Sequence, residues 1–192
     1  MQGAAVHRFI EHQAATRGDA LAYVGGADAL TYRDLNWRAN TVARALIAHG
    51  FRRGSLAAVR MEPAAEVVVT LLGVLKAGGA YVWVDDRSWP AGVSVVQERR
   101  DGEEKGLAVD LSRVLADEAR PCPNMPILTR PSDVACVLGE VLVPHATITG
   151  LRETPVPADV EWPEGGALDI WLALMTGATL TGSRRRLDPV AA

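Results

Sequence analysis

The sequence has few cysteines, few aromatic residues other than tryptophan, and no long run of apolar residues or of like charges. Its two cysteines, Cys122 and Cys136, are too few for a disulfide framework and lack the spacing of zinc ligands. Twenty basic and 23 acidic residues give a formal net charge of −3, which argues against a nucleic-acid binder. No segment has the pattern of a signal peptide or of a membrane span. We therefore expect a cytoplasmic protein that binds neither nucleic acid, nor a membrane, nor a metal.

The composition that remains is that of a folded domain. The 192 residues are 48% hydrophobic and 22% charged, which suits one compact unit with a real core. We expect a single α/β domain over residues 1–182 and a polar tail over 183–192. The tail holds the one basic cluster, Arg184 to Arg186, which we interpret as solvated, with a phosphate contact as the alternative.

Hydrophobic periodicity in the first half alternates between helix and strand. The pattern predicts an amphipathic helix that Gly18 ends, then a hairpin of strands 20–24 and 29–32. A second helix begins with Thr31 or Asp34 as its cap and runs to about Ala48. The segments "SLAAVRM", "PAAEVVVTLLGVLKAGG" and "AYVWVDD" predict a strand, a helix and a strand, which implies parallel strands joined by a crossover.

The second half is less regular. Two strands are expected around "RRDGEEKG", then a short helix at "SRVLADEA", and the proline-rich "RPCPNMPILTRPSD" must be extended or loop. "ALDIWLALMTG" predicts a helix and "ATLTG" a strand. Between them and the loop, "DVACVLGEVLVPHATITGL" predicts a strand, a two-residue turn at Gly139 and Glu140, and a second strand that runs out through Pro144 and His145.

Two segments of the first half carry a resemblance to a known family. "LTYRDLNWRANTVARALIAHG" and "VVVTLLGVLKAGGAYVWVDD" are similar to the first two signatures of the adenylation domains of non-ribosomal peptide synthetases, which belong to the adenylate-forming superfamily. The resemblance is specific over roughly residues 5 to 90, although Trp83 and Asp86 stand where the family usually has prolines. It implies a remnant of the adenylate-forming N-terminal fold: a mostly parallel sheet flanked by helices, with a small β-hairpin.

The same resemblance implies that adenylation chemistry is missing. "DVACVL" and "VLVPHATITGL" look like the strands on either side of the family's phosphate loop, but only Gly139 and Glu140 stand between them. The family's ribose-binding Asp and catalytic Lys belong to segments expected beyond Ala192, together with most of its substrate pocket and its C-terminal subdomain. We therefore expect a truncated, degenerate homologue that holds no cofactor and is no amino-acid adenylating ligase.

Three residues are candidates for a rebuilt site: Glu140, His145 and Asp169. Each also has a structural interpretation: Glu140 as a solvated turn residue, His145 as a structural histidine, and Asp169 as an exposed residue of a helix. Five tryptophans are many for this length, and some could cover exposed faces, although Trp37 and Trp171 are read as core. The tryptophans are Trp37, Trp83, Trp89, Trp162 and Trp171.

Three hypotheses for function follow. The first is a non-catalytic homologue in non-ribosomal peptide or other secondary-metabolite biosynthesis, which contacts a synthetase, a carrier protein or a tailoring enzyme. An open sheet edge or uncovered apolar face would also favour a homodimer. The second is an enzyme repurposed for ATP-independent chemistry on a small-molecule or carrier-bound intermediate. The third is a remnant without a selected role.

Overall fold

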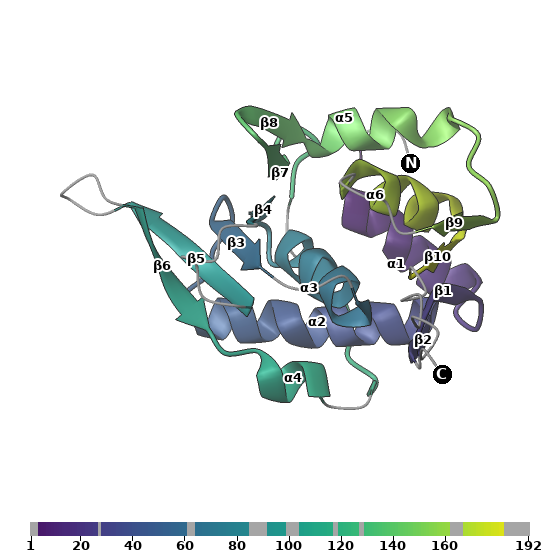
Figure 1. The fold of residues 1–192 in the computed structure, drawn as a ribbon, viewed down its shortest axis with the longest axis horizontal. Helices are drawn as coiled ribbons and strands as arrows, with labels where there is room; N and C mark the ends of the chain where they lie inside the picture. Colours follow the sequence, from purple (N-terminus) through teal and green to yellow (C-terminus); the bar gives the residue numbers. More distant parts are fainter. Residues whose placement is uncertain are drawn as a thin grey trace, which may run out of the picture.

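The structure is a computed structural model that describes residues 4–26, 28–60, 64–84, 92–98, 104–116, 119–126, 129–161 and 167–182. These residues form two sheets with helices packed on them and between them (Figure 1), which confirms the expected α/β class. Within these ranges, no helix is both long enough and apolar enough to cross a membrane. The predicted polar tail over 183–192, with its arginine cluster, lies outside the described residues.

The smaller sheet joins the two ends of the chain. The predicted hairpin forms between β1 and β2, and two strands from the C-terminal third extend it in parallel, with Tyr23 opposite Leu180. The sequence did not predict β9, which has only three residues, two of them acidic. The strand order is β2 (Asp28–Thr31), β1 (Leu21–Gly25), β10 (Thr179–Thr181), β9 (Asp159–Glu161).

The larger sheet holds the predicted crossover at its centre. The strand, helix and strand of residues 56–83 do place two parallel neighbours side by side, and a third parallel strand follows them. The other pairings are antiparallel, so the sheet is more mixed than the expected mostly parallel one, because hairpins supply both of its edges. The strand order is β6 (Glu104–Val109), β5 (Gly92–Glu98), β3 (Leu56–Arg60), β4 (Ala80–Trp83), β7 (Val134–Leu138), β8 (Val141–Pro144).

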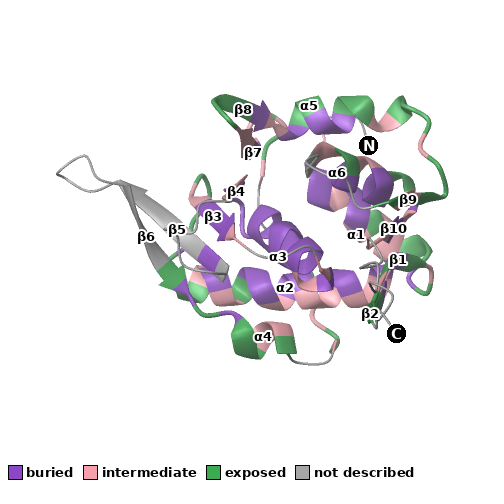
Figure 2. Cartoon of the chain, viewed as in Figure 1, coloured by how far each residue is buried: buried purple, intermediate pink, exposed green. Residues whose placement is uncertain are grey.

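Helix α3 (Ala65–Lys76) is the centre of the core. It contacts α1 (Val6–Thr16), α2 (Tyr32–Ala48) and strands of both sheets. Almost every side chain of α3 is buried, and Figure 2 shows it purple along its length. A helix that is apolar on all sides is stable only when neighbours surround it, and here two helices and two sheets do so. This arrangement places both sheets around one core.

Local chemistry sets where the helices begin and end. Thr31, and not Asp34, caps α2, because its hydroxyl accepts a hydrogen bond of 3.1 Å from the Asp34 N–H. Gly50 has a φ of 94° just beyond the end of α2, a backbone conformation that glycine adopts without strain. The remaining helices are α4 (Ser112–Ala116), α5 (His145–Gly150), the 3₁₀ turn η1 (Leu151–Glu153) and α6 (Ala167–Thr176).

Trp37 and Trp171 were both predicted to lie in the core, and the prediction is confirmed for Trp171 alone of these two. Trp171 is fully buried on α6, and its Nε1–H donates a 2.7 Å hydrogen bond to the hydroxyl of Tyr81 on β4. Trp37 and Trp83 are only half-buried, whereas Trp89 and Trp162 lie outside the described residues. Cys136, which stands opposite Tyr81 in the sheet register, is fully buried, as expected of a small apolar side chain.

Candidate functional site

The turn between β7 and β8 occupies the place where the sequence predicts a missing loop. Leu138 pairs with Val141, so Gly139 and Glu140 alone connect the two strands. Gly139 has a φ of 59°, the positive value that the first central position of a tight hairpin turn requires. Both turn residues are exposed. The predicted strand, turn and strand are therefore confirmed, and the turn offers one carboxylate and no cation.

In the described part of the chain, no hydrogen bond or ion pair joins a basic side chain to this turn. Arg53 lies at the opposite end of β7, where its guanidinium makes two 2.9 Å hydrogen bonds to the Asp133 carboxylate. The hydrogen bond from the Arg130 N–H and the Arg53 guanidinium lower the pKa of Asp133, against an opposing effect of desolvation. Strand β8 itself is the edge of the larger sheet, and Val141 and Leu142 on it are 62% and 63% exposed.

His145 is the first residue of α5, and not the last of the preceding strand. Its ring is completely buried, and its Nδ1 accepts a 3.2 Å hydrogen bond from the Val6 N–H of α1. The backbone N–H of His145 donates a 3.0 Å hydrogen bond to the backbone carbonyl oxygen of Asp133. Burial lowers the pKa of His145 to about 4, although the nearby Asp133 carboxylate opposes the shift. The ring is therefore neutral at neutral pH and takes part in helix packing.

The three candidate residues occupy unlike environments. Asp169 is exposed in the first turn of α6, where a carboxylate interacts favourably with the helix dipole. Glu140 is exposed in the β7–β8 turn, and His145 is buried beneath α1. No hydrogen bond or ion pair found in the described part of the chain joins any two of them. A general base needs a reachable partner or substrate, and this arrangement provides none among the three.

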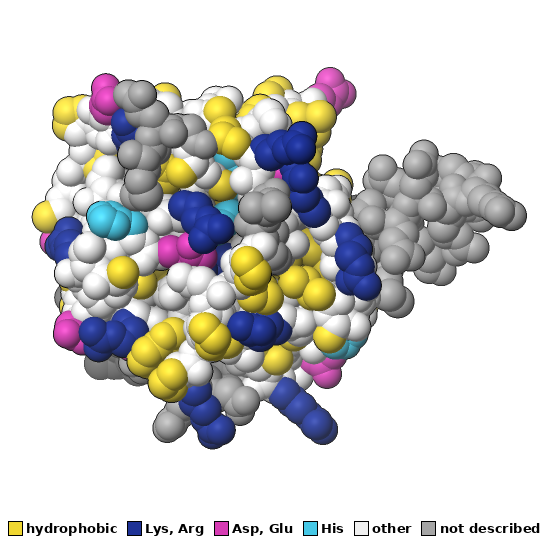
Figure 3. Space-filling model, turned by 180° about the vertical axis from the view of Figure 1, so that it is seen from behind, with side chains coloured by type: hydrophobic (Ala, Val, Ile, Leu, Met, Phe, Trp, Pro, Cys, Tyr) yellow, Lys and Arg dark blue, Asp and Glu magenta, His cyan; other side chains and the backbone are white. Residues whose placement is uncertain are grey.

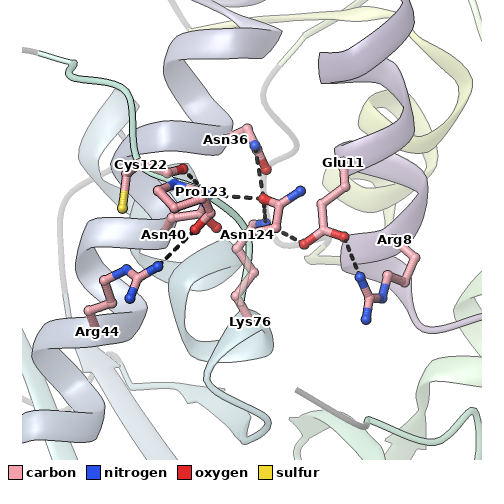
Figure 4. Close-up of polar contacts among 9 residues, drawn as sticks. All are labelled: Arg8, Glu11, Asn36, Asn40, Arg44, Lys76, Cys122, Pro123 and Asn124. Atoms are coloured by element: carbon pink, nitrogen blue, oxygen red, sulfur yellow. Dashed lines mark hydrogen bonds and ion pairs between the residues drawn. The ribbon is translucent and has the colours of Figure 1, made fainter. Parts of the chain in front are cut away.

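A polar cluster that the sequence analysis did not single out lies between α1, α2 and α3 (Figure 4), and Asn36, Asn40 and Lys76 are its buried members. The Lys76 Nζ forms a 2.7 Å ion pair with Glu11 Oε1, and these side chains are only 3% and 10% exposed. Arg8 holds the other carboxylate oxygen of Glu11 at 2.9 Å. Burial lowers the pKa of Lys76, while the charge and hydrogen bond of Glu11 act in the opposite direction. The pair is thus desolvated and neutralised internally.

Asn124 links this ion pair to α2. Its Oδ1 accepts hydrogen bonds from Asn36, Asn40 and Lys76 at 3.0, 2.9 and 3.2 Å. Asn40 also donates to the Cys122 carbonyl at 2.7 Å, so the proline-rich segment is fixed onto the two helices α2 and α3. Asn36, Asn40 and Lys76 all lie inside the two segments that resemble the family's signatures. Their place in these segments is the one feature of the sequence that could have pointed to the cluster. We name Glu11, Asn36, Asn40, Lys76 and Asn124 the signature cluster.

The remaining surface and thiols carry little chemistry. On the face seen in Figure 3, basic side chains stand apart from one another with apolar side chains between them, and they form no continuous stripe. Burial raises the pKa of the Cys136 thiol, which is therefore a poor nucleophile. Among the residues that the structure describes, no group of three or more His, Cys, Asp or Glu side chains could hold a metal ion.

Comparison with known protein families gives one match. The family model described as AMP-binding enzyme matches residues 10–100. That range begins within α1, includes α2, β3, α3 and β4, and ends before the β7–β8 turn. It also contains four of the five residues of the signature cluster.

Curated proteins similar to this chain include surfactin, bacitracin and tyrocidine synthases. Surfactin synthase subunit 2 of Bacillus subtilis is 29% identical over 215 residues, which cover 93% of this chain and 6% of that protein. Tyrocidine synthase 1 of Brevibacillus parabrevis is 44% identical over 84 residues, covering 44% of this chain and 8% of that protein. The chain therefore spans a small part of the relatives that it matches.

Solved structures show the same fold. The N-terminal subdomain of NpsA from Klebsiella oxytoca, in space group C2, superposes with a TM-score of 0.76 at 20% identity and covers 95% of this chain and 56% of that one. An artificially fused adenylation–PCP di-domain, NpsA-ThdA, gives a TM-score of 0.74 at 19% identity, with 96% of this chain and 40% of that one covered. At these identities the likeness establishes the fold alone.

Proposed function

Because this chain is related to the adenylation domains of non-ribosomal peptide synthetases and resembles their N-terminal part, we propose that it is a non-catalytic homologue acting in the biosynthesis of a non-ribosomal peptide or another secondary metabolite. The observation that carries this proposal is the two-residue turn of Gly139 and Glu140 between paired strands. On this proposal the chain does not bind ATP in the family's manner, and its role depends on contacts with other proteins.

Phosphate binding requires convergent N–H donors and a cation. A turn of two residues between strands already paired at Leu138 and Val141 offers too few N–H groups to surround a triphosphate. The Glu140 carboxylate would repel each phosphate charge at about 4 Å by about 1 kcal/mol in water, and by more where water is excluded. Arg53 cannot compensate, because Asp133 already holds its guanidinium in a bidentate pair.

A calorimetric titration with Mg-ATP tests this part of the proposal. We expect no saturable heat up to millimolar nucleotide, while a complete synthetase adenylation domain titrated in parallel serves as the positive control. Micromolar affinity of this chain for ATP would overturn the proposal. A folded circular dichroism spectrum and a cooperative melting curve must accompany the titration, so that loss of binding is not loss of fold.

The second part of the proposal is that the chain acts through contacts with other proteins. Exposed apolar side chains on an edge strand support it, because such edges pair readily with other chains. In the described part of the chain, the most exposed large apolar residues are Val141 and Leu142 on β8. We propose a carrier protein as the partner at this edge, since the fold also occurs in a structure where an adenylation domain is joined to a PCP. A synthetase, a tailoring enzyme or a second copy of this chain are the other outcomes of the test.

Size-exclusion chromatography coupled to light scattering distinguishes these partners. The chain is run alone, then with the carrier protein, synthetase or tailoring enzyme encoded beside it. We expect a complex with the carrier protein that the double substitution V141K/L142K abolishes. The control is L151K, which places a single lysine at a 39% exposed leucine on η1 and should leave the complex intact. Absence of any association, or equal loss with L151K, would contradict the contact at β8.

The alternative of a repurposed enzyme receives less support from the arrangement of side chains. Glu140 and Asp169 lie in solvent and His145 is engaged with Val6. Substituting all three and measuring whether the mutant gene restores a missing metabolite would decide between the two hypotheses. Restoration by the triple variant would exclude these residues as the catalytic ones.

A further inference from the structure

Two buried histidines that the proposed function does not use meet where α1 packs on α5. His7 is 3% exposed and His145 is fully buried. Their rings are arranged edge to face, with centroids 6.1 Å apart. Among the described residues, one hydrogen bond involves these rings, and it runs from the Val6 N–H to Nδ1 of His145 at 3.2 Å. This bond joins parts of the chain 139 residues apart, so it couples the N-terminal helix to the element that follows β8.

That hydrogen bond determines which ring nitrogen of neutral His145 carries the proton. Because Nδ1 accepts, the ring proton of the neutral form must reside on Nε2, which is buried and has no hydrogen-bond partner among the described residues. Nδ1 of His7 is buried without a partner as well. A second proton on His145 would have to bind at Nδ1, where it would point at the Val6 N–H. Two donors would then face each other, and the bond to α1 would be lost.

The charges around the pair oppose protonation of His7 and only weakly favour that of His145. Lys76 of α3 and Arg8 of α1 lie near His7, and both also pair with Glu11. Burial, followed by the charges of Lys76, His145 and Arg8, lowers the pKa of His7 well below its usual value. On the other side, Asp133 is the carboxylate near His145, and Arg53 already neutralises it.

Other charged groups on the surrounding elements are directed elsewhere. Arg152 of η1 lies over the Phe9 ring of α1 at 5.7 Å and is within 3.6 Å of Glu153. Helix α6 packs against both α1 and α5, and its one charged side chain, Asp169, is exposed. No carboxylate in the described structure is therefore free to stabilise a doubly protonated pair of imidazoles.

We propose that His7 and His145, together with the Val6 N–H, form an acid-sensitive latch that holds α1 on α5 when both rings are neutral and releases it when His145 is protonated. The latch acts at the junction between the signature cluster and the β7–β8 hairpin. It is independent of whether the chain binds ATP or a partner protein.

The direction of the pH effect follows from linkage. In the open state the histidines titrate near their usual pKa of about 6.5, whereas in the closed state the pKa of His145 is about 4. The latch is therefore at full strength above about pH 6.5 and weakens as the pH falls toward 4. Between pH 7.5 and 5.5 the opening constant should rise about tenfold for one histidine, and up to about a hundredfold if both titrate.

Amide hydrogen exchange, corrected for the intrinsic effect of pH, measures this opening. We expect protection factors in α1 and α5 to fall at least about tenfold between pH 7.5 and 5.5, while those in α2 change less than about threefold. The variant His145→Asn should remove the contribution of His145, about tenfold, because Asn Oδ1 can occupy the position of Nδ1 and accept from Val6 without titrating; any fall that remains is due to His7. The control His12→Asn replaces an exposed histidine on the same helix and should behave as the wild type.

Two results would overturn the latch. One is an equal fall of protection in His145→Asn and in the wild type, or an equal fall in α2. The other is an NMR titration of the folded wild type in which the His145 ring protonates near its usual pKa with α1 still protected. The NMR titration needs no substitution, so it decides the question even if His145→Asn does not fold.

Discussion

The β7–β8 hairpin and the signature cluster stand in opposite relation to solvent. Gly139, Glu140, Val141 and Leu142 are all exposed. In the signature cluster Asn36, Asn40 and Lys76 are buried and the Glu11 side chain is 10% exposed, while the exposed Asn124 accepts a hydrogen bond from each of the three buried residues. The hairpin lies where the family resemblance is reduced to fragments, whereas the cluster lies largely in the segments where the resemblance is strong.

This difference separates residues that serve the scaffold from residues that serve chemistry. A buried ion pair must be retained or replaced as a unit, because one partner left alone is an uncompensated charge. A solvated turn can be shortened at little cost, since its polar groups exchange protein contacts for water. Family signatures can therefore persist for reasons of folding, whatever chemistry the turn supports.

Removing Lys76 should give the largest effect on stability. The substitution K76M keeps the length of the side chain but leaves Glu11, 10% exposed, with Arg8 as its only charged partner. We expect the free energy of unfolding to fall by about 3 kcal/mol, measured by urea denaturation at pH 7. The double variant E11Q/K76M should recover a large part of this loss, because it removes both charges together.

The exposed pair of Arg53 and Asp133 is the matched control for this prediction. Its guanidinium is 41% exposed, so R53M should cost no more than about 1 kcal/mol. Equal costs for K76M and R53M would show that the two regions do not differ in the way argued above.

A glycine at the contact between α2 and α3 should give the next largest effect. A methyl group on Gly73 would collide with the Val42 side chain and lie 3.2 Å from the Ala39 carbonyl oxygen. G73A should therefore lower the free energy of unfolding by about 2 kcal/mol, because the close approach of the two helices must widen. Thermal unfolding followed by circular dichroism measures this loss.

Gly150 provides the comparison within the less buried region. Gly150 lies in α5, and a methyl group added there would meet no neighbouring atom. G150A should therefore raise the free energy of unfolding by about 0.5 kcal/mol, because alanine has a higher helix propensity than glycine. Opposite signs for the two glycine substitutions are expected. A loss of stability in both would indicate that α5 is packed as tightly as the helices of the core.

Periodicity was sufficient for most elements and insufficient for their pairing. The helices α2, α3 and α6 are long and strongly apolar on at least one face, so their patterns predicted them. Strand β9 has three residues and no usable period. The boundary at His145 was misplaced, because its burial depends on α1, which lies more than a hundred residues earlier in the chain.

The turn was predicted because its two residues are adjacent in the sequence, whereas the signature cluster was not. Asn36 and Asn124 are 88 residues apart and meet only once the proline-rich segment has folded over α2. Asn36, Asn40 and Lys76 lie inside the two segments that resemble the family's signatures, but the segments gave no partner for any of them. Long-range hydrogen bonds of this kind follow from tertiary packing, and local preference does not encode them.

The smallest effect on stability is expected at Glu140. The substitution E140K changes a solvated side chain in a turn that Gly139 already permits, so the free energy of unfolding should change by less than about 0.5 kcal/mol. The same variant replaces repulsion of a triphosphate by attraction while the turn keeps its two residues. If the shortness of the turn prevents ATP binding, calorimetry will detect no micromolar binding by E140K. Micromolar binding would show instead that the carboxylate is the obstacle, and a loss above about 1 kcal/mol would show that the turn carries packing of its own.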